Sequence, residues 1–175
     1  MQLPAHMEPA PIPANEQQRL EALHALLLLD TPPEERFDRI VEFAAAEFDV
    51  PVVLLSLIDE NRQWFKSKIG VGLCETPREI SFCGHAIHCD KVLVVPDARV
   101  DERFVDNPLV LDDPFIRFYA GAPLILPEGQ AIGTLCLIDT KVRHLDSTDL
   151  SILSALRDLV VTEILSPGKM PEVMP

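Results

Sequence analysis

Hydrophobic residues change their spacing along this chain. Near both ends, leucine, valine, alanine and phenylalanine recur three or four residues apart, which predicts helices over residues 16–29, 34–48 and 147–165. The middle of the chain holds shorter apolar runs between turn residues, which are typical of strands. Helices at the ends and strands between them predict an α+β fold, in which helices pack on one face of an antiparallel sheet.

The apolar runs in the middle of the chain predict five strands, over residues 52–59, 63–69, 92–95, 120–126 and 131–138. The last two flank a turn at residues 127–130, so we expect them to be antiparallel neighbours. Gly121 and Gly133 lie inside them, and a glycine within a strand often marks the close approach of a backbone or a ligand. This pair of strands therefore predicts a sheet with part of one face open.

Several residues near the ends of these elements have side chains suited to local roles. Thr31 and Ser147 are expected to cap the second and the last long helix through their hydroxyls. Ser81 is expected to cap a short helix that runs to about His88. Trp64 alternates with lysines, which indicates an exposed position at a sheet edge or a contact with a partner.

Proline-rich ends without periodicity flank the patterned region. Residues 1–15 are predicted to be a flexible leader, and residues 166–175 a flexible tail. The folded unit is then a single domain over residues 16–165, which suits a chain of 175 residues.

The composition of the chain limits which binding partners and which cellular compartment can be expected. With 28 acidic against 15 basic residues and a formal net charge of −13, the chain lacks the clustered lysine and arginine that nucleic acids or anionic lipids require. It has no apolar run of about 18 residues and no secretory signal at its start, so we expect no contact with a membrane. Four cysteines without an export signal predict reduced thiols and a cytoplasmic location.

Six stretches of sequence stand in a characteristic order. They are LDTPPEERFDRIVEFAAAEFDVPVVLLSLID, RQWFKSKIG, SFCGHAI, LVVPDARVDERFVDNPLV, IRFYAGAPL and GTLCLID. In this order the chain resembles a GAF domain, a PAS-related module that senses small molecules in bacterial signalling. The resemblance implies a six-stranded antiparallel sheet with the terminal helices on one face. The short helix and the loop over residues 97–114 would roof a pocket on the other face.

The pocket that the resemblance implies would have eight residues in contact with a small ligand. They are Phe82, Cys83, His85, Phe104, Arg117, Phe118, Tyr119 and Cys136. Arg117 is the candidate polar anchor, because a guanidinium can hold an anion through two hydrogen bonds. It could equally pair with an acidic residue of the loop over residues 97–113. The ligand itself is not identified, and no catalytic residue or cofactor is assigned.

Three other uses of the cysteine-rich segment SFCGHAIHCD are disfavoured. The spacing of Cys83, His85, His88 and Cys89 does not match the usual spacers of zinc sites, so no metal site is predicted. Bilin-binding GAF domains place a histidine directly after the attachment cysteine, whereas Gly84 follows Cys83 here. The Asn-Lys pair of GAF domains that bind cyclic nucleotides is absent.

Two alternatives to a sensor remain open. Some GAF proteins reduce free methionine sulfoxide, and Cys74, Cys83 and Cys89 would supply the attacking and resolving thiols. A ligand-free scaffold that binds only a protein is the other alternative. Our leading interpretation is a regulatory sensor and not an enzyme.

The sensor interpretation implies protein partners. GAF domains usually act beside an effector, and this sequence ends ten residues after the last predicted helix. We therefore expect a signalling kinase or cyclase to act in trans. The terminal helices are expected to form a homodimer through surplus apolar residues, and these are Leu20, Leu23, Leu27, Leu153, Leu156 and Val160.

Overall fold

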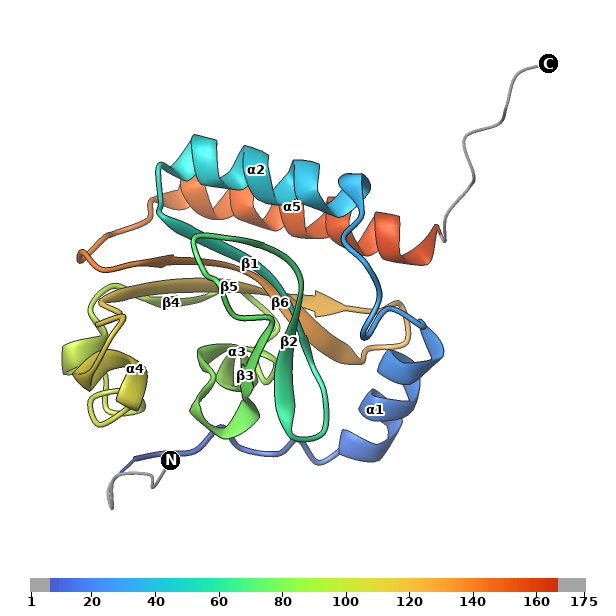
Figure 1. Ribbon diagram of the computed structural model, residues 1–175, viewed down its shortest axis with the longest axis horizontal. Helices are drawn as coiled ribbons and strands as arrows, with labels where there is room; N and C mark the ends of the chain where they lie inside the picture. Colours follow the sequence, from blue (N-terminus) through green and yellow to red (C-terminus); the bar gives the residue numbers. More distant parts are fainter. Residues whose placement is uncertain (1–6, 167–175) are drawn as a thin grey trace.

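The computed structural model describes residues 7–166, which form one antiparallel sheet with helices on both sides (Figure 1). The sheet has six strands in the order β3-β2-β1-β6-β5-β4. The strands are β1 (Val52–Ile58), β2 (Arg62–Ile69), β3 (Glu75–Pro77), β4 (Leu93–Val95), β5 (Phe118–Ile125) and β6 (Ala131–Asp139). The α+β fold class and the antiparallel hairpin of β5 and β6 are confirmed.

Two long helices cover one face of the sheet. Helices α2 (Glu35–Phe48) and α5 (Ser147–Leu165) lie side by side there, and the short helices α3 (Phe82–Ala86) and α4 (Pro108–Leu111) lie on the other side (Figure 1). Helix α1 (Glu16–Ala25) is shorter than predicted and packs beside β6 at the end of the sheet. Leu23 of α1 is buried in the same apolar core as the buried residues of α2 and α5, so the three terminal helices share one core, as expected.

The sheet separates two apolar cores. The helix-side core lies between the sheet and α2 and α5, and includes Phe37, Leu55, Leu135 and Leu153. The roof-side core lies between the sheet and α3 with the loop before β5, and it is described below. Strands β1, β5 and β6 are buried on both faces, which explains why their sequences are nearly continuous apolar runs.

A register shift in β2 changes which of its residues share a face, and places Trp64 on the same face as Ser67 and Ile69. Leu55 pairs with Ser67 but Ser56 pairs with Phe65, so Lys66 is the extra residue of a bulge. Trp64 is consequently buried in the helix-side core at 8% exposure, and the prediction of an exposed tryptophan is wrong.

Two of the three predicted helix caps lie within a few residues of the observed ones, and the third is as predicted. Thr31 donates its hydroxyl to the Leu28 carbonyl, and the residue that precedes the first turn of α2 is Glu34. Helix α5 begins with a reciprocal capping box between Asp146 and Asp149, one residue before the predicted cap. Ser81 caps α3 as predicted, because its hydroxyl accepts a hydrogen bond from the Gly84 amide at 3.0 Å.

The predicted leader is partly packed against the domain. Residues 7–15 contain no strand and only a turn before α1, yet Met7 and Ala10 are buried. The expectation of a flexible leader therefore does not hold for these residues. Residues 1–6, and residues 167–175 of the predicted tail, lie outside the described part of the chain.

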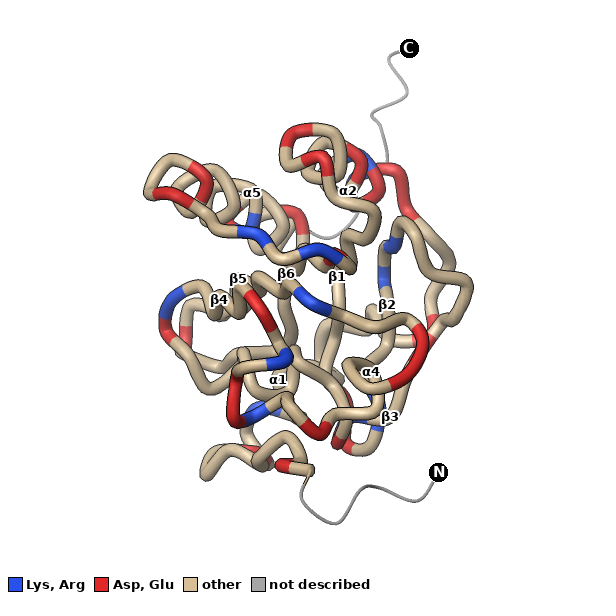
Figure 2. The backbone as a smooth tube through the Cα atoms, turned by 90° about the vertical axis from the view of Figure 1, so that its left-hand side faces the viewer, with Lys and Arg blue, Asp and Glu red and all other residues tan. Residues whose placement is uncertain are grey.

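Charged groups are distributed without a basic face in the view of Figure 2, where lysine and arginine lie among acidic residues. Over residues 7–166, no helix combines the length and the apolar character that crossing a bilayer requires.

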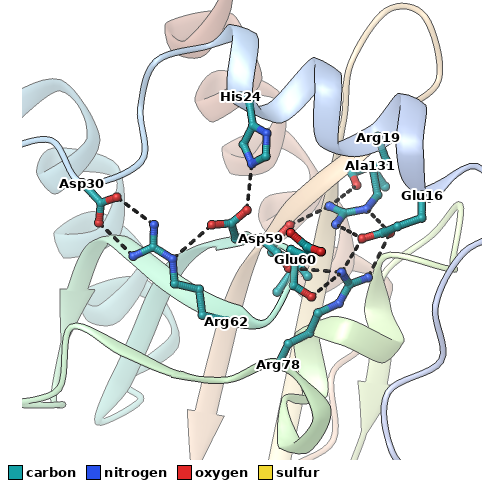
Figure 3. Close-up of polar contacts among 10 residues, drawn as sticks. Glu16, Arg19, His24, Asp30, Asp59, Glu60, Arg62, Arg78 and Ala131 are labelled. Carbon is teal, nitrogen blue, oxygen red and sulfur yellow. Dashed lines mark hydrogen bonds and ion pairs between the residues drawn. The ribbon is translucent and has the colours of Figure 1, made fainter.

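A buried ion-pair network attaches α1 to the sheet (Figure 3). The Glu16 carboxylate accepts hydrogen bonds from Arg19, at 2.8 Å from Nε, and from Arg78. Arg19 also donates to the Ile58 carbonyl at 2.7 Å, and Arg78 donates to the Asp59 carbonyl at 3.1 Å. Both arginines are almost fully buried, so the one carboxylate between them offsets much of the cost of burying their charge.

The same network lowers the pKa of Glu16 from 4.5 to about 2. Burial raises this pKa, but hydrogen bonds and charge attraction from Arg19 and Arg78 outweigh burial. The ionised carboxylate is therefore the form that the fold stabilises.

We predict that Glu16→Gln lowers the free energy of unfolding at pH 7 by about 1–2 kcal/mol, after allowance for solvent screening. Because the folded-state pKa is depressed, this contribution is complete above pH 4.5 and is lost as the pH falls toward about 2. Urea unfolding of both proteins between pH 2 and 7 measures the difference.

The control variant is Glu35→Gln, which breaks an exposed ion pair with Arg39. It should change the free energy of unfolding by less than about 0.5 kcal/mol at any pH. Equal losses in the two variants would contradict the role assigned to Glu16.

Candidate functional site

The roof side of the sheet encloses two buried thiols, those of Cys83 and Cys136. Helix α3 points Cys83 toward the sheet, where three strands contribute polar side chains: Ser56 from β1, Tyr119 from β5, and Thr134 with Cys136 from β6. These side chains are all buried. They form a polar cluster inside an otherwise apolar core.

The four neighbours lie within hydrogen-bonding distance of the Cys83 sulfur. Thr134 Oγ1 and the Tyr119 hydroxyl donate to it at 3.0 and 3.1 Å. Ser56 Oγ lies at 3.7 Å and Cys136 Sγ at 3.8 Å. The second sulfur beside Cys83 therefore belongs to Cys136, whereas Cys74 is exposed and Cys89 is half-buried.

This environment lowers the pKa of the Cys83 thiol from 9.0 to about 7. Burial raises the pKa, but hydrogen bonds from Cys136, Thr134, Tyr119 and Ser56 together favour the thiolate more strongly. The pKa of Tyr119 and that of Cys136 are raised, first by burial and then by the nearby Cys83. If the cluster loses a proton, the proton comes from Cys83.

Aromatic rings connect the roof to the sheet. Phe82 of α3 stacks on Phe104 of the roof loop with ring centroids 4.0 Å apart, and it contacts Tyr119 at 5.2 Å. His85 meets the Phe104 ring edge-on at 4.8 Å. The pKa of His85 is lowered to about 4, first by burial and second by the charge of Arg103, so this side chain is neutral at pH 7.

The two strand glycines have different roles. A Cβ atom at Gly121 would lie 2.1 Å from the Tyr119 hydroxyl oxygen, so the Tyr119 ring fills the space that this glycine leaves. A Cβ at Gly133 would lie 1.9 Å from the Ser56 carbonyl of the neighbouring strand. The space beside Gly121 is therefore filled by a side chain, and the space beside Gly133 by the backbone of β1.

Six of the eight predicted ligand-contacting residues meet in this roof-side cluster. They are Phe82, Cys83, His85, Phe104, Tyr119 and Cys136. Two polar members, Ser56 and Thr134, were missed. Their sequence signal is a hydroxyl inside an apolar strand, and alternation places Thr134 on the same face as Cys136.

Two predicted residues lie elsewhere. Phe118 belongs to the helix-side core, because side chains alternate along β5 and Tyr119 takes the roof side. Its assignment to the pocket is wrong. Arg117 donates to the carbonyls of Val110 and Ile116, at 3.0 and 3.2 Å, so it holds the roof loop through backbone groups instead of an acidic side chain.

Hollows of ligand size open elsewhere on the surface. One of about 340 Å³ lies between α2 and β2, and one of about 420 Å³ lies beside residues 9–12. Neither is lined by any of the eight predicted residues. Within residues 7–166, no three histidine, cysteine or acidic side chains gather closely enough to hold a metal ion.

Comparison with known proteins identifies relatives for most of the chain. The family model for the GAF domain matches residues 32–164. Cyclic di-GMP phosphodiesterase PA2567 of Pseudomonas aeruginosa is 42% identical over 159 residues, which are 90% of this chain. The chain spans only 27% of the length of that relative.

Solved structures share the fold at low sequence identity. The GAF domain of a phosphoenolpyruvate-protein phosphotransferase from Acinetobacter has a TM-score of 0.62 at 16% identity, and the match covers 85% of this chain and 94% of that one. Free methionine-R-sulfoxide reductase from Neisseria meningitidis has a TM-score of 0.60 at 17% identity, covering 86% of this chain and 88% of that one. The fold, the order of the strands and the family match agree, and the chain belongs to the GAF domain family.

Proposed function

We propose that this GAF domain is a regulatory sensor that binds a small molecule between the sheet and the roof. The observation that carries the proposal is the polar cluster around Cys83, which lies inside an apolar core beside the stacked rings of Phe82 and Phe104. A few convergent polar groups within an apolar lining are typical of small-molecule sites.

The chemistry of the cluster indicates the class of ligand. Among residues 7–166, the side chains hydrogen-bonded to Cys83 are all uncharged. His85 is neutral at pH 7, and the Arg117 guanidinium is bonded to backbone carbonyls. Burying an unpaired charge there would be costly. The proposed ligand is therefore a small uncharged molecule that exchanges hydrogen bonds with Tyr119 and Thr134.

The proposed output is control of a signalling enzyme that acts in trans. The 42% identity with a cyclic di-GMP phosphodiesterase supports a place in bacterial signalling of that type. The cytoplasm is the proposed location, because it keeps the four cysteines reduced.

We predict that native mass spectrometry detects a small molecule on wild-type protein incubated with a small-molecule extract of the cells that produce it. Thr134→Val keeps the side-chain volume but removes a hydrogen bond to the ligand, so it should weaken retention about 5- to 100-fold. The matched control is Thr162→Val, on the exposed face of α5. A wild-type protein that carries no added mass would contradict the sensor and favour a ligand-free scaffold.

A second candidate function is thiol-dependent reduction of free methionine sulfoxide. It is favoured by the 3.8 Å separation of the Cys83 and Cys136 sulfurs. In this reaction the Cys83 thiol would take the sulfoxide oxygen, which releases methionine and leaves a sulfenic acid. The Cys136 thiol would then condense with the sulfenic acid, forming a disulfide and water, and an external dithiol would reduce the disulfide.

The reductase candidate predicts methionine formation from free methionine sulfoxide in the presence of dithiothreitol. Cys83→Ser should abolish turnover, because it removes the attacking sulfur, whereas Cys74→Ser should leave turnover unchanged. Amino-acid analysis measures the product. No turnover by the wild-type protein would eliminate this candidate.

A homodimer through the helix layer is the proposed route of the signal. Leu23, Leu153 and Val160 of the stripe suggested by the sequence are fully buried in the helix-side core. The helices still expose Phe43 at 54% and Leu159 at 53%. Leu27 of the predicted stripe is exposed at 81%, but it lies beyond the end of α1, and the surface that we assign to a second copy consists of Phe43 and Leu159.

Charge placement on α2 fits a two-fold pairing. Arg39 and Glu47 are exposed and lie four residues before and after Phe43. If two copies of α2 pack antiparallel about Phe43, Arg39 of one copy lies opposite Glu47 of the other.

We predict that light scattering after size exclusion shows a dimer, and that Phe43→Glu combined with Leu159→Glu converts it to a monomer. Two buried charges without partners are expected to weaken association by at least about 100-fold. Val100→Glu, at an 81% exposed position in a short 3-10 helix outside the helix layer, is the matched control and should leave the dimer intact. A wild-type monomer at high concentration would contradict the proposal.

A further inference from the structure

Residues 7–12, which we call the strap, cross the outside of the roof helix α3. Figure 1 shows this dark blue segment running below α3 toward α1. The Ala10 amide donates to the Glu79 carbonyl at 3.0 Å, and a hydrogen bond of 2.8 Å joins the His88 ring to the Pro11 carbonyl. The strap therefore contacts the chain both before and after α3.

The tightest contact is between Ala10 and Gly84. A Cβ atom at Gly84 would lie only 2.6 Å from the Ala10 Cβ, so this glycine leaves the space that the strap occupies. Ala10 is buried, and so are all five residues of α3, although α3 lies in the outer layer of the roof. The strap supplies the missing cover on the outer face of α3, while Cys83 faces the sheet on the inner side.

The strap is held by hydrogen bonds of its backbone at Glu8, Ala10 and Pro11 and by the buried side chains of Met7 and Ala10. It has no regular secondary structure, and beside it lies a hollow of about 420 Å³ lined by Pro9, Ala10 and Ile12 together with Arg78 and Glu79. Its C-terminal end leads to Glu16, which is bound to Arg78 directly before α3 (Figure 3). A segment without regular secondary structure opens at a lower free energy than the central strands of a sheet, so the strap can be released while the sheet stays folded.

We infer that the strap is a releasable cover that holds α3 against the sheet and so keeps Cys83, on the inner side of α3, enclosed. When the strap leaves, the Gly84 face of α3 loses its partner. A helix of five residues has little stability of its own, so α3 lifts and the Cys83 cluster becomes accessible. Regulation of a ligand site by the strap rests on the proposed function. The role of the strap as a cover can be tested without any ligand.

The test measures alkylation of Cys83 by iodoacetamide in the full chain carrying Cys74→Ser and Cys89→Ser, followed by peptide mass spectrometry. In this background Ala10→Glu cannot keep its place against Gly84, so labelling of Cys83 should become about tenfold faster. The matched control is Ile12→Glu in the same strap, where the side chain is 60% exposed, and its rate should stay within about twofold of the parent. An unchanged rate in Ala10→Glu would overturn the inference.

Hydrogen exchange of the unsubstituted chain provides a second measurement that needs no variant. The amides of Ala10 and Ile87 should exchange at one common rate, about tenfold or more faster than the amides of β1 and β6. Exchange of the Ile87 amide together with the sheet would overturn the inference, even if Ala10→Glu failed to fold. If Ala10→Glu speeds the labelling of Cys83 but native mass spectrometry finds no retained small molecule, the role of the strap is supported and only the proposed sensor is rejected.

Discussion

The burial of the central strands on both faces is the constraint on which this structure depends. Strands β1, β5 and β6 have a core on each side, so any polar side chain they carry needs a partner inside the protein. Ser56, Tyr119 and Thr134 meet this requirement by converging on the Cys83 sulfur. The same contacts that satisfy the sheet also create the one environment in the roof-side core where a thiol is readily ionised.

The two sides of the sheet are secured very differently. The helix side is covered by α2 and α5, which have 14 and 19 residues and contribute long apolar stripes. The roof side depends on α3 and α4, which have five and four residues, and on stacked rings and a strap. Short elements held by few contacts open more easily than long helices. A site that must admit a small molecule would therefore open on the roof side, while the helix side preserves the fold.

Local patterns predicted the elements that are long and strongly periodic. The range of α5 and the pairing of β5 with β6 follow from apolar spacing. The periodicity that identifies each of these elements is contained within its own stretch of sequence. The three residues of β3, the bulge at Lys66 and the position of α1 were not predictable in this way. Each depends on a distant partner: β3 on the edge of β2, the bulge on β1, and α1 on Arg78 through Glu16.

The sequence by itself determined the fold class, the family resemblance and most members of the candidate site, because periodicity and ordered motifs are local properties. Only the tertiary structure decided that Phe118 lies on the helix side, that Cys136 is the thiol beside Cys83, and that Tyr119 fills the space at Gly121. It also decided that residues 7–12 cover α3. The physical reason is that contact across a sheet depends on register and strand order, and spacing along the chain specifies neither.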